Sequence, residues 1–186
     1  FQMLFRFTLK SYFKVITFSG KENIPEEGPV IFIANHPSAL MDPLVLGALL
    51  NRQLYFLAAA EYMGKGLVYF FLERFIHMIP VYRPTIHPGE VAKNEDVFRK
   101  CYAHLDKEGV ILIFPEGSSV TANRLQPLKT GTARIALGAE KNSNGATKVT
   151  IIPIGINYGD SHTFRKDLFV NIGAPISLDD PEIANI

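Results

Sequence analysis

A histidine and an aspartate lie close together in the segment from Ile33 to Pro43. His36 follows a short apolar run, and Asp42 stands at the expected start of the next helix. If Asp42 accepts a hydrogen bond from one ring nitrogen of His36, it fixes the tautomer and leaves the other nitrogen free as a base. Such a pair can take a proton from a substrate hydroxyl. The alternative is structural, because Asp followed by Pro is favourable as a helix N-cap and first helical residue.

Three further segments place polar residues at the ends of apolar runs or at a helix start. Arg83 follows a strand-like run, and an arginine there can bind phosphate with two hydrogen bonds. Glu116 and Gly117 follow a wholly apolar run, where a carboxylate can bind the hydroxyls of a polyol. Lys129 precedes an expected helix, which suits anion binding. The alternatives are a solvated arginine, an ordinary turn and a capped helix.

Apolar strand-like runs alternate with helical patterns along the chain. This alternation predicts a single α/β domain with a mixed, largely parallel sheet of about seven strands flanked by helices. In such sheets, ligands bind where strands end and helices begin, which is where the candidate residues lie. The strands are expected at residues 15–19, 30–34, 54–58, 79–82, 110–114, 149–157 and 168–172, and the helices at 43–50, 63–77, 90–107 and 130–141.

The composition narrows the class of protein. A chain of 186 residues, of which 47% are hydrophobic, can bury a substantial core as one domain. The formal net charge of +1 gives no electrostatic argument for binding nucleic acid. Cys101 is the single cysteine, which excludes an internal disulfide and suits a reducing compartment. The five histidines are scattered without a second ligand at helical spacing, so no metal site is predicted.

The N-terminal segment, residues 1–18, is predicted to form an amphipathic helix at a membrane interface, ahead of a domain spanning 19–186. Arg6, Lys10 and Lys14 recur every four residues and form a basic stripe. Basic residues beside aromatic ones favour an anionic lipid surface, and packing on the domain is the alternative. The segment is too short and too charged to span a bilayer. Its apolar face comprises Phe1, Leu4, Phe5, Leu9, Tyr12, Phe13 and Ile16.

Taken in order, these segments resemble the sequence blocks of the glycerolipid acyltransferase family. The family includes lysophosphatidic acid acyltransferases and glycerol-3-phosphate acyltransferases. Its blocks are Asn-His followed by Asp, an apolar strand ending in Arg, Phe-Pro-Glu-Gly followed by Ser or Thr, and a Val/Ile-Pro-Val/Ile strand. The matching residues are Asn35, His36 and Asp42; Ile79 to Arg83; Phe114 to Ser118; and Ile152 to Ile154.

The resemblance implies transfer of an acyl group from acyl-CoA or acyl-carrier protein to a hydroxyl of 1-acylglycerol 3-phosphate or glycerol 3-phosphate, in phospholipid biosynthesis. His36 would be the general base, and Asp42 would orient it. The thioester is a co-substrate, and no cofactor is implied. The resemblance further implies a peripheral or monotopic protein on the cytoplasmic face of a phospholipid membrane. The substrate-binding residues would be Asn35, Arg83, Glu116, Gly117, Ser118 and Lys129.

Two departures from the family pattern leave the acceptor open. Five residues separate His36 from Asp42, whereas the usual spacing has four, and the longer spacing resembles a subset of glycerol-3-phosphate acyltransferase-like members. Ser119 stands where many members carry an arginine. A phosphate contact in that region would therefore come from Arg124 or Lys129.

Two other functions fit parts of the sequence. A catalytically silent lipid-binding module would share the amphipathic N-terminus, but the intact His36 and Asp42 pair and Arg83 argue against it. A serine hydrolase acting on lipid esters would need a nucleophile. Ser38 lies near His36 without the Gly-x-Ser-x-Gly turn of such a residue. Acyl transfer is therefore the predicted reaction.

Overall fold

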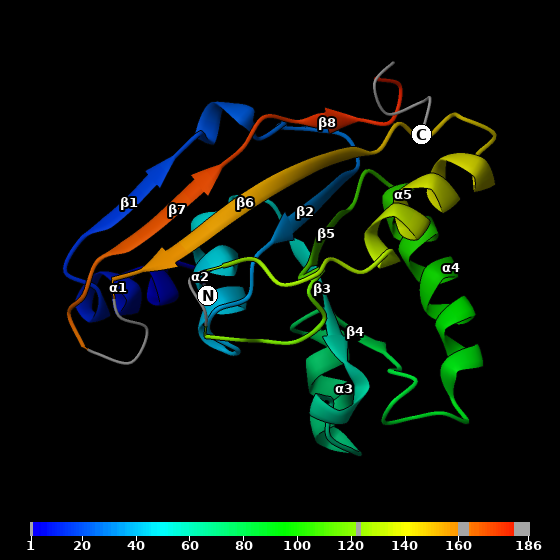
Figure 1. Ribbon diagram of the computed structural model, residues 1–186, viewed down its shortest axis with the longest axis horizontal. Helices are drawn as coiled ribbons and strands as arrows, with labels where there is room; N and C mark the ends of the chain where they lie inside the picture. Colours follow the sequence, from blue (N-terminus) through cyan, green and yellow to red (C-terminus); the bar gives the residue numbers. More distant parts are fainter. Residues whose placement is uncertain (1, 122–123, 160–163, 181–186) are drawn as a thin grey trace.

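The computed structural model describes residues 2–121, 124–159 and 164–180 (Figure 1). Phe1, expected on the apolar face of the first helix, lies outside the described residues. The elements in chain order are α1 (Gln2–Tyr12), β1 (Ile16–Ser19), η1 (Lys21–Asn23), β2 (Val30–Ala34), α2 (Met41–Leu49), β3 (Leu54–Ala59), η2 (Ala60–Tyr62), α3 (Leu67–Arg74), β4 (Met78–Val81), η3 (Val91–Lys93), α4 (Asn94–Leu105), β5 (Val110–Ile113), α5 (Gly131–Asn142), β6 (Thr150–Tyr158), β7 (Leu168–Ile172) and β8 (Ile176–Ser177).

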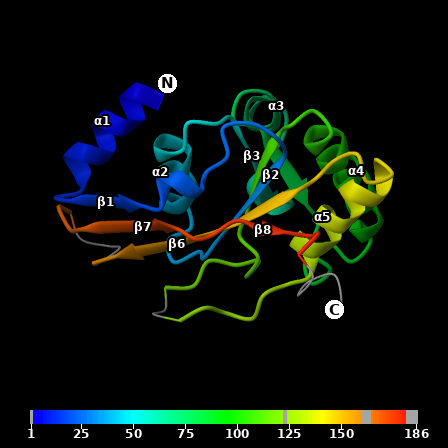
Figure 2. The same ribbon diagram turned by 90° about the horizontal axis from the view of Figure 1, so that it is seen from above.

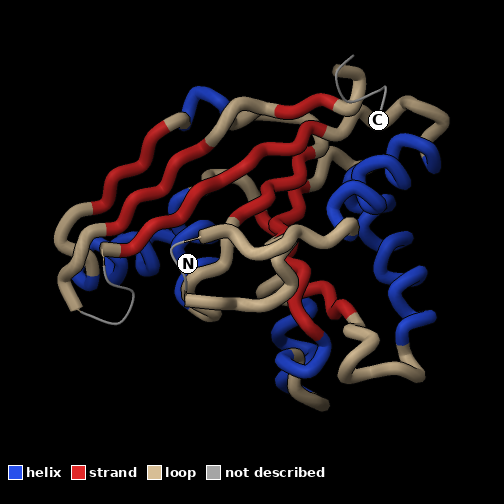
Figure 3. Tube along the Cα trace, viewed as in Figure 1, coloured by secondary structure: helices blue, strands red, loops and turns tan. Residues whose placement is uncertain are grey.

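The strands form one mixed, mostly parallel sheet, as the sequence predicted. Its order is β1-β7-β6-β2-β5-β3-β4, and β8 pairs with β6. The central strand β2 is parallel to both neighbours, β5 and β6, while β6 runs antiparallel to β7 and β8. Figure 3 shows β1, β7 and β6 side by side. The eighth strand, β8, was not expected, because two residues are too few to give a periodic pattern.

Helices cover both faces of the sheet, and the side chains of β2 alternate between two cores. Val30 and Phe32 join the core beneath α1 and α2, whereas Ile31 joins the core that includes residues of α4 and α5. This alternation follows from the period of two in a strand. It explains why β2 is apolar throughout, since both of its faces are buried. Figure 2 shows α1 and α2 on the same side of β1, β7 and β6.

The N-terminal segment forms a shorter helix than residues 1–18. The helix α1 ends at Tyr12, and β1 begins at Ile16. The last residues of the segment therefore belong to the strand predicted at 15–19, not to the helix. Leu9 and Phe13 are buried in the first core, which shows that α1 packs on the domain. Three further apolar side chains of α1, Met3, Leu4 and Phe7, are exposed. Within the described residues, no helix is long and apolar enough to cross a membrane.

The helix expected at residues 63–77 is limited to α3, Leu67–Arg74. Gly66, immediately before it, has φ 59° and ψ −126°, a conformation that essentially requires glycine and that no helix contains. His77, after it, has φ 60° and so cannot continue a right-handed helix. The apolar pattern therefore extended beyond the residues whose backbone is helical.

Candidate active site

The central strand β2 ends next to the start of α2, and this brings His36 and Asp42 together. His36 Nδ1 lies 2.8 Å from Asp42 Oδ2. The Asp42 side chain is fully buried, whereas 15% of the His36 side chain is exposed. The helix begins at Met41 with Leu40 as its N-cap residue, so Asp42 is not the N-cap. The structural alternative for Asp42, a helix cap followed by Pro, is therefore wrong, and its carboxylate faces the histidine.

The Asp42 carboxylate is held by two further donors. The backbone N–H of Ser38 donates to Oδ2 at 2.8 Å, and the Tyr158 hydroxyl donates to Oδ1 at 2.6 Å. Burial and the negative charge of Asp42 raise the pKa of Tyr158 well above its usual range, so the hydroxyl stays protonated and donates. An ionised carboxylate only accepts hydrogen bonds, so the ring proton of neutral His36 lies on Nδ1. His36 Nε2 then carries the lone pair, and no described residue bonds to it.

Two residues expected at the substrate instead bind backbone around His36. Asn35 joins β2 to β6, because its amide accepts from Ile156 N at 2.7 Å and donates to Ile156 O at 2.8 Å. Glu116 is buried and accepts from the backbone N–H groups of His36, at 3.2 Å, and Gln126, at 3.4 Å. Both side chains thus hold the loop that carries the histidine.

The ring of Phe114 fixes the plane of the imidazole. Its centroid lies 4.0 Å from that of His36, with an interplanar angle of 15°. Phe114 follows β5, the parallel neighbour of β2, so the two rings come from adjacent strand ends. The stacked ring covers one face of the base, and the exposed part of the imidazole is left for a substrate.

Arg83 and Lys129 converge on Gly117. Arg83 follows β4, and its Nη1 donates to the Gly117 carbonyl at 3.3 Å. Gly117 has φ 71°, and a Cβ added to it would lie 2.5 Å from Lys129 Nζ. A side chain at this position would therefore strain the backbone and displace the lysine. Since Glu116 binds the His36 loop, residues 116–117 connect the histidine to the two cations. Ser118, the next residue, is exposed.

A cluster around Arg83 includes residues that the sequence analysis missed. Arg83 Nη2 donates to Glu61 Oε1, and His87 Nε2 lies 3.8 Å from Glu61 Oε2. Three buried atoms have no hydrogen-bond partner in the described structure: Glu61 Oε2, Arg83 Nε and His87 Nε2. The register of β3 and β4 could have identified Glu61. Ala59 pairs with Val81, and Glu61 and Arg83 each follow two residues later.

At these strand ends a buried carboxylate orients a histidine, and Arg83 and Lys129 meet at Gly117, which follows the residue that binds the His36 backbone. A model of the acyltransferase family matches residues 15–157 of the chain, so this protein belongs to that family. Glycerol-3-phosphate O-acyltransferase 2 of Saccharomyces cerevisiae is 36% identical over 91 residues, covering 49% of this chain and 12% of the relative. Glycerol-3-phosphate O-acyltransferase 1 of the same yeast is 39% identical over 82 residues, covering 44% of this chain and 11% of the relative.

The fold also matches a solved structure. The 1-acyl-sn-glycerophosphate (LPA) acyltransferase PlsC from Thermotoga maritima superposes with a TM-score of 0.66 and 18% sequence identity. The match covers 98% of this chain and 71% of that chain. The chain therefore shares the whole fold with PlsC, while it spans only about an eighth of the yeast relatives.

Proposed function

We propose that this protein transfers a fatty acyl group from an acyl thioester to a hydroxyl of a glycerol phosphate acceptor, as a step of phospholipid biosynthesis. The observation that carries the proposal is the His36–Asp42 pair, whose Nδ1–Oδ2 distance of 2.8 Å leaves Nε2 without a bond to any described residue. Arg83 and Lys129 meet at Gly117, next to the glutamate that binds the His36 backbone. Membership of the acyltransferase family supports the reaction type.

His36 Nε2 takes the proton of the acceptor hydroxyl while the oxygen attacks the thioester carbonyl carbon. The C–O bond forms, the C–S bond breaks, and the thiolate leaves with the proton returned by the imidazolium. Asp42 stabilises that imidazolium across the Nδ1–H hydrogen bond. No covalent acyl-enzyme is needed. Cys101 is fully buried in a core, and burial raises the pKa of its thiol to about 12.

Arg83 and Lys129 bind the acceptor phosphate. A guanidinium binds phosphate with two parallel hydrogen bonds, and a lysine adds a point charge. Arg83 Nε is buried and has no hydrogen-bond partner among the described residues, so a phosphate oxygen that reaches it would supply the missing acceptor. Because residues 116–117 link this pair to His36, phosphate binding also positions the acceptor hydroxyl at the base.

We assign glycerol 3-phosphate as the acceptor in preference to its 1-acyl derivative. Two features support this choice: the five residues between His36 and Asp42, and the similarity to two yeast glycerol-3-phosphate O-acyltransferases. The acyl donor is a thioester of coenzyme A or of acyl-carrier protein.

We further propose that the protein works on the cytoplasmic face of a membrane, bound peripherally or monotopically. Exposed large apolar side chains support this location, because exposed apolar patches often mark sites of membrane or protein interaction. They gather on α3, which presents Leu67, Val68, Phe70 and Phe71, and on the segment after the candidate site, which presents Val120, Leu125 and Leu128.

The test is an assay of the purified protein in mixed micelles with radiolabelled oleoyl-CoA or oleoyl-acyl-carrier protein, given each acceptor separately. We expect acylation of glycerol 3-phosphate at a rate at least ~10-fold above that of its 1-acyl derivative, equivalent to about 1.4 kcal/mol of discrimination. Acylation of the 1-acyl derivative alone would overturn the assignment of glycerol 3-phosphate as the acceptor. Absence of any product would favour the silent lipid-binding module, and release of free fatty acid without acceptor would favour a hydrolase.

A further inference from the structure

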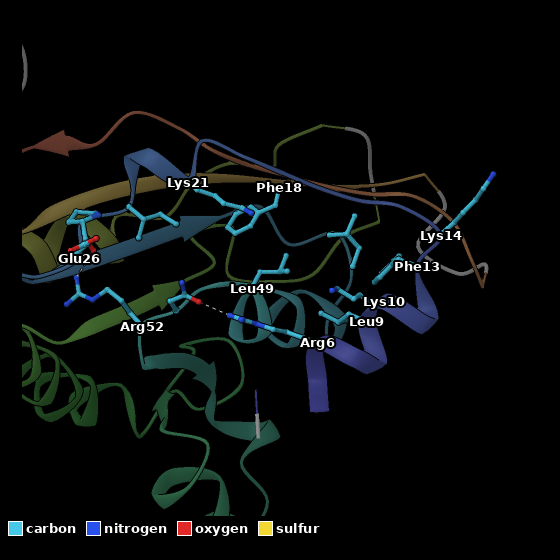
Figure 4. Close-up of a pocket in the computed structure, with 14 residues that line it drawn as sticks. Arg6, Leu9, Lys10, Phe13, Lys14, Phe18, Lys21, Glu26, Leu49 and Arg52 are labelled. Carbon is cyan, nitrogen blue, oxygen red and sulfur yellow. Dashed lines mark hydrogen bonds between the residues drawn. The ribbon is translucent and has the colours of Figure 1, made fainter. Parts of the chain in front are cut away.

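A groove of about 850 Å³ lies between α1, β1, η1 and the end of α2, and its lining includes none of the site residues described above (Figure 4). A groove of this size is in the range of small-molecule sites. Its lining falls into two chemical groups, an apolar floor and a basic rim. Each group comes from several elements, so the groove exists only in the folded chain.

The rim carries five cations and one carboxylate, Glu26. The cations are Arg6, Lys10, Lys14, Lys21 and Arg52. In the part of the chain that the structure describes, none of the five forms an ion pair with a carboxylate. A positive field of this kind, bounded by a low-dielectric wall, attracts an anion.

The two arginines of the rim are fixed by neutral groups. Arg6 donates to the Ala48 carbonyl at 2.6 Å and to Asn51 Oδ1 at 2.7 Å. Arg52 donates to the carbonyls of Gly28, at 2.7 Å, and Glu108, at 2.8 Å. Burial lowers the pKa of Arg52, which is the expected effect on a cation removed from water. Both guanidinium groups are therefore held in place by neutral acceptors, and the negative charges of Glu108 and Glu27 offset the charge of Arg52 only in part.

The floor is apolar and continuous with the first core. Leu9 of α1 and Phe13, which follows this helix, are buried, and Phe18 of β1 and Leu49 of α2 are half-buried against the same core. Figure 4 shows the basic and the apolar side chains lining the same groove. Lys21 Nζ lies 4.8 Å from the centre of the Phe18 ring. An occupant must therefore combine an anionic group with a hydrocarbon chain.

We propose that this groove binds one molecule of an anionic phospholipid, with an acyl chain along the floor and the phosphate against Arg6, Lys10 and Lys21. The source of the lipid is the membrane surface, so the inference rests on the proposed membrane association but not on acyl transfer. The charge complementarity argues for a phosphate head, and the apolar floor argues against a free phosphate or a coenzyme without a chain.

The experiment uses fluorescence, because the chain has no tryptophan. Phe18→Trp places a single indole in the groove, and the protein is titrated with dioctanoylphosphatidylglycerol below its micelle concentration. This probe is anionic but is not a glycerol phosphate acceptor. We expect a saturable change in emission. The affinity for zwitterionic dioctanoylphosphatidylcholine should be at least about tenfold weaker, because each cation near an anionic headgroup contributes about 1 kcal/mol and the rim carries several cations.

Two variants in the same background locate the binding. Lys10→Glu with Lys21→Glu reverses two exposed charges of the rim, and we expect Kd for the anionic lipid to rise by about tenfold or more. Lys141→Glu, at an exposed position near the end of α5, is the matched charge control and should leave binding unchanged. Leu49→Trp in the chain with Phe18 retained fills the groove, and calorimetry should then detect no binding of the soluble lipid, while adsorption to vesicles containing 30% phosphatidylglycerol persists.

Three results would overturn the proposal. Equal affinity for the two lipids would show that charge plays no part. Displacement of the lipid by coenzyme A or inorganic phosphate at matched concentration would assign the site to a free phosphate ligand. An unchanged Kd in the double charge-reversal variant would place the lipid elsewhere. The acyl transfer assay is separate, so failure of this inference leaves the proposed reaction intact.

Discussion

The two halves of the candidate site differ in how completely their polar atoms are paired. At the end of β2, both carboxylate oxygens of Asp42 and the Nδ1 atom of His36 have partners at 2.6–2.8 Å. At the ends of β3 and β4, Glu61, Arg83 and His87 each leave one buried polar atom without a hydrogen-bond partner among the described residues, although Glu61 Oε2 and His87 Nε2 lie 3.8 Å apart. The first half is complete without a ligand, whereas the second is not.

This difference separates chemistry from binding. A base that is already oriented needs no rearrangement during the reaction, which is the condition for effective general-base catalysis. A buried polar atom without a partner costs about 1–3 kcal/mol, and a ligand that supplies the partner recovers that energy. A phosphate oxygen would satisfy Arg83 Nε, so binding of the acceptor would remove part of this cost. We therefore expect substitutions in the first half to lower kcat and substitutions in the second half to change KM.

The largest effect is expected for His36→Ala. Loss of a general base lowers kcat by ~10²–10⁴-fold, while the affinity for the acceptor, measured by calorimetry, should be unchanged. His77→Asn is the matched control. His77 precedes β4 and so lies at the end of that strand away from the candidate site, and Asn tolerates its positive φ. Turnover of His36→Ala near the wild-type rate would remove the histidine from the mechanism.

Arg83→Ala should act on the acceptor. Hydrogen bonds to charged groups contribute about 1.5–3 kcal/mol, so KM for the acceptor should rise by about 10–100-fold with a smaller change in kcat. Steady-state kinetics over a range of acceptor concentrations measures both constants. Arg99→Ala, at an exposed position on α4, should match the wild type. An unaltered acceptor KM in Arg83→Ala would mean that the phosphate binds elsewhere.

Tyr158→Phe removes one of the donors to Asp42 and should lower kcat by about tenfold or less, together with about 2 kcal/mol of stability. The pKa of Tyr158 is raised in the folded state, so its contribution to stability is present below pH ~10 and is lost as the pH rises above that value. Urea unfolding at pH 8 and pH 11 should therefore show a smaller difference between wild type and variant at pH 11. Tyr62→Phe, at an exposed tyrosine, is the control. The same difference in unfolding free energy at both pH values would contradict a link between Tyr158 ionisation and stability.

The smallest effect is expected at Glu61, which accepts a hydrogen bond from Arg83, the residue proposed to bind the phosphate. Glu61→Gln removes the competing charge but keeps an acceptor for Arg83, so acceptor KM should fall by up to about fivefold, less than 1.4 kcal/mol. Glu61→Ala leaves Arg83 unsupported, and KM should rise. The two variants distinguish a Glu61 that competes with the phosphate from a Glu61 that only positions Arg83. Equal shifts of the acceptor KM in the same direction for both variants would contradict the exchange of Glu61 for phosphate.

The bounds of two strands, β2 and β7, agree with the predicted ranges. The residues of β2 form a wholly apolar run and those of β7 alternate between buried and exposed, and both patterns are local signals. The bounds of α3 did not agree, since Gly66 and His77 impose backbone conformations that an apolar pattern does not encode. Local composition therefore predicts burial better than it predicts where a helix ends.

In the site, the sequence identified residues that carry a chemical signal of their own. His36, Asp42, Arg83, Gly117 and Lys129 all lie where the strand ends meet. Roles that depend on pairing between distant strands were not predictable. Asn35 binds the backbone of Ile156, 121 residues away, and Tyr158 reaches Asp42 across 116 residues. Such contacts become visible only when the order and register of the strands are known.

The central claim is that Asp42 orients His36 for catalysis, and kcat of Asp42→Asn tests it most directly. The substitution keeps the size of the side chain and removes the charge that stabilises the imidazolium. We predict a folded protein with unchanged acceptor affinity and a loss in kcat on the order of 10²-fold or more. Asp96→Asn, at an exposed position on α4, should match the wild type. A kcat for Asp42→Asn within a few-fold of the wild type would contradict the account and leave Asp42 with a purely structural role.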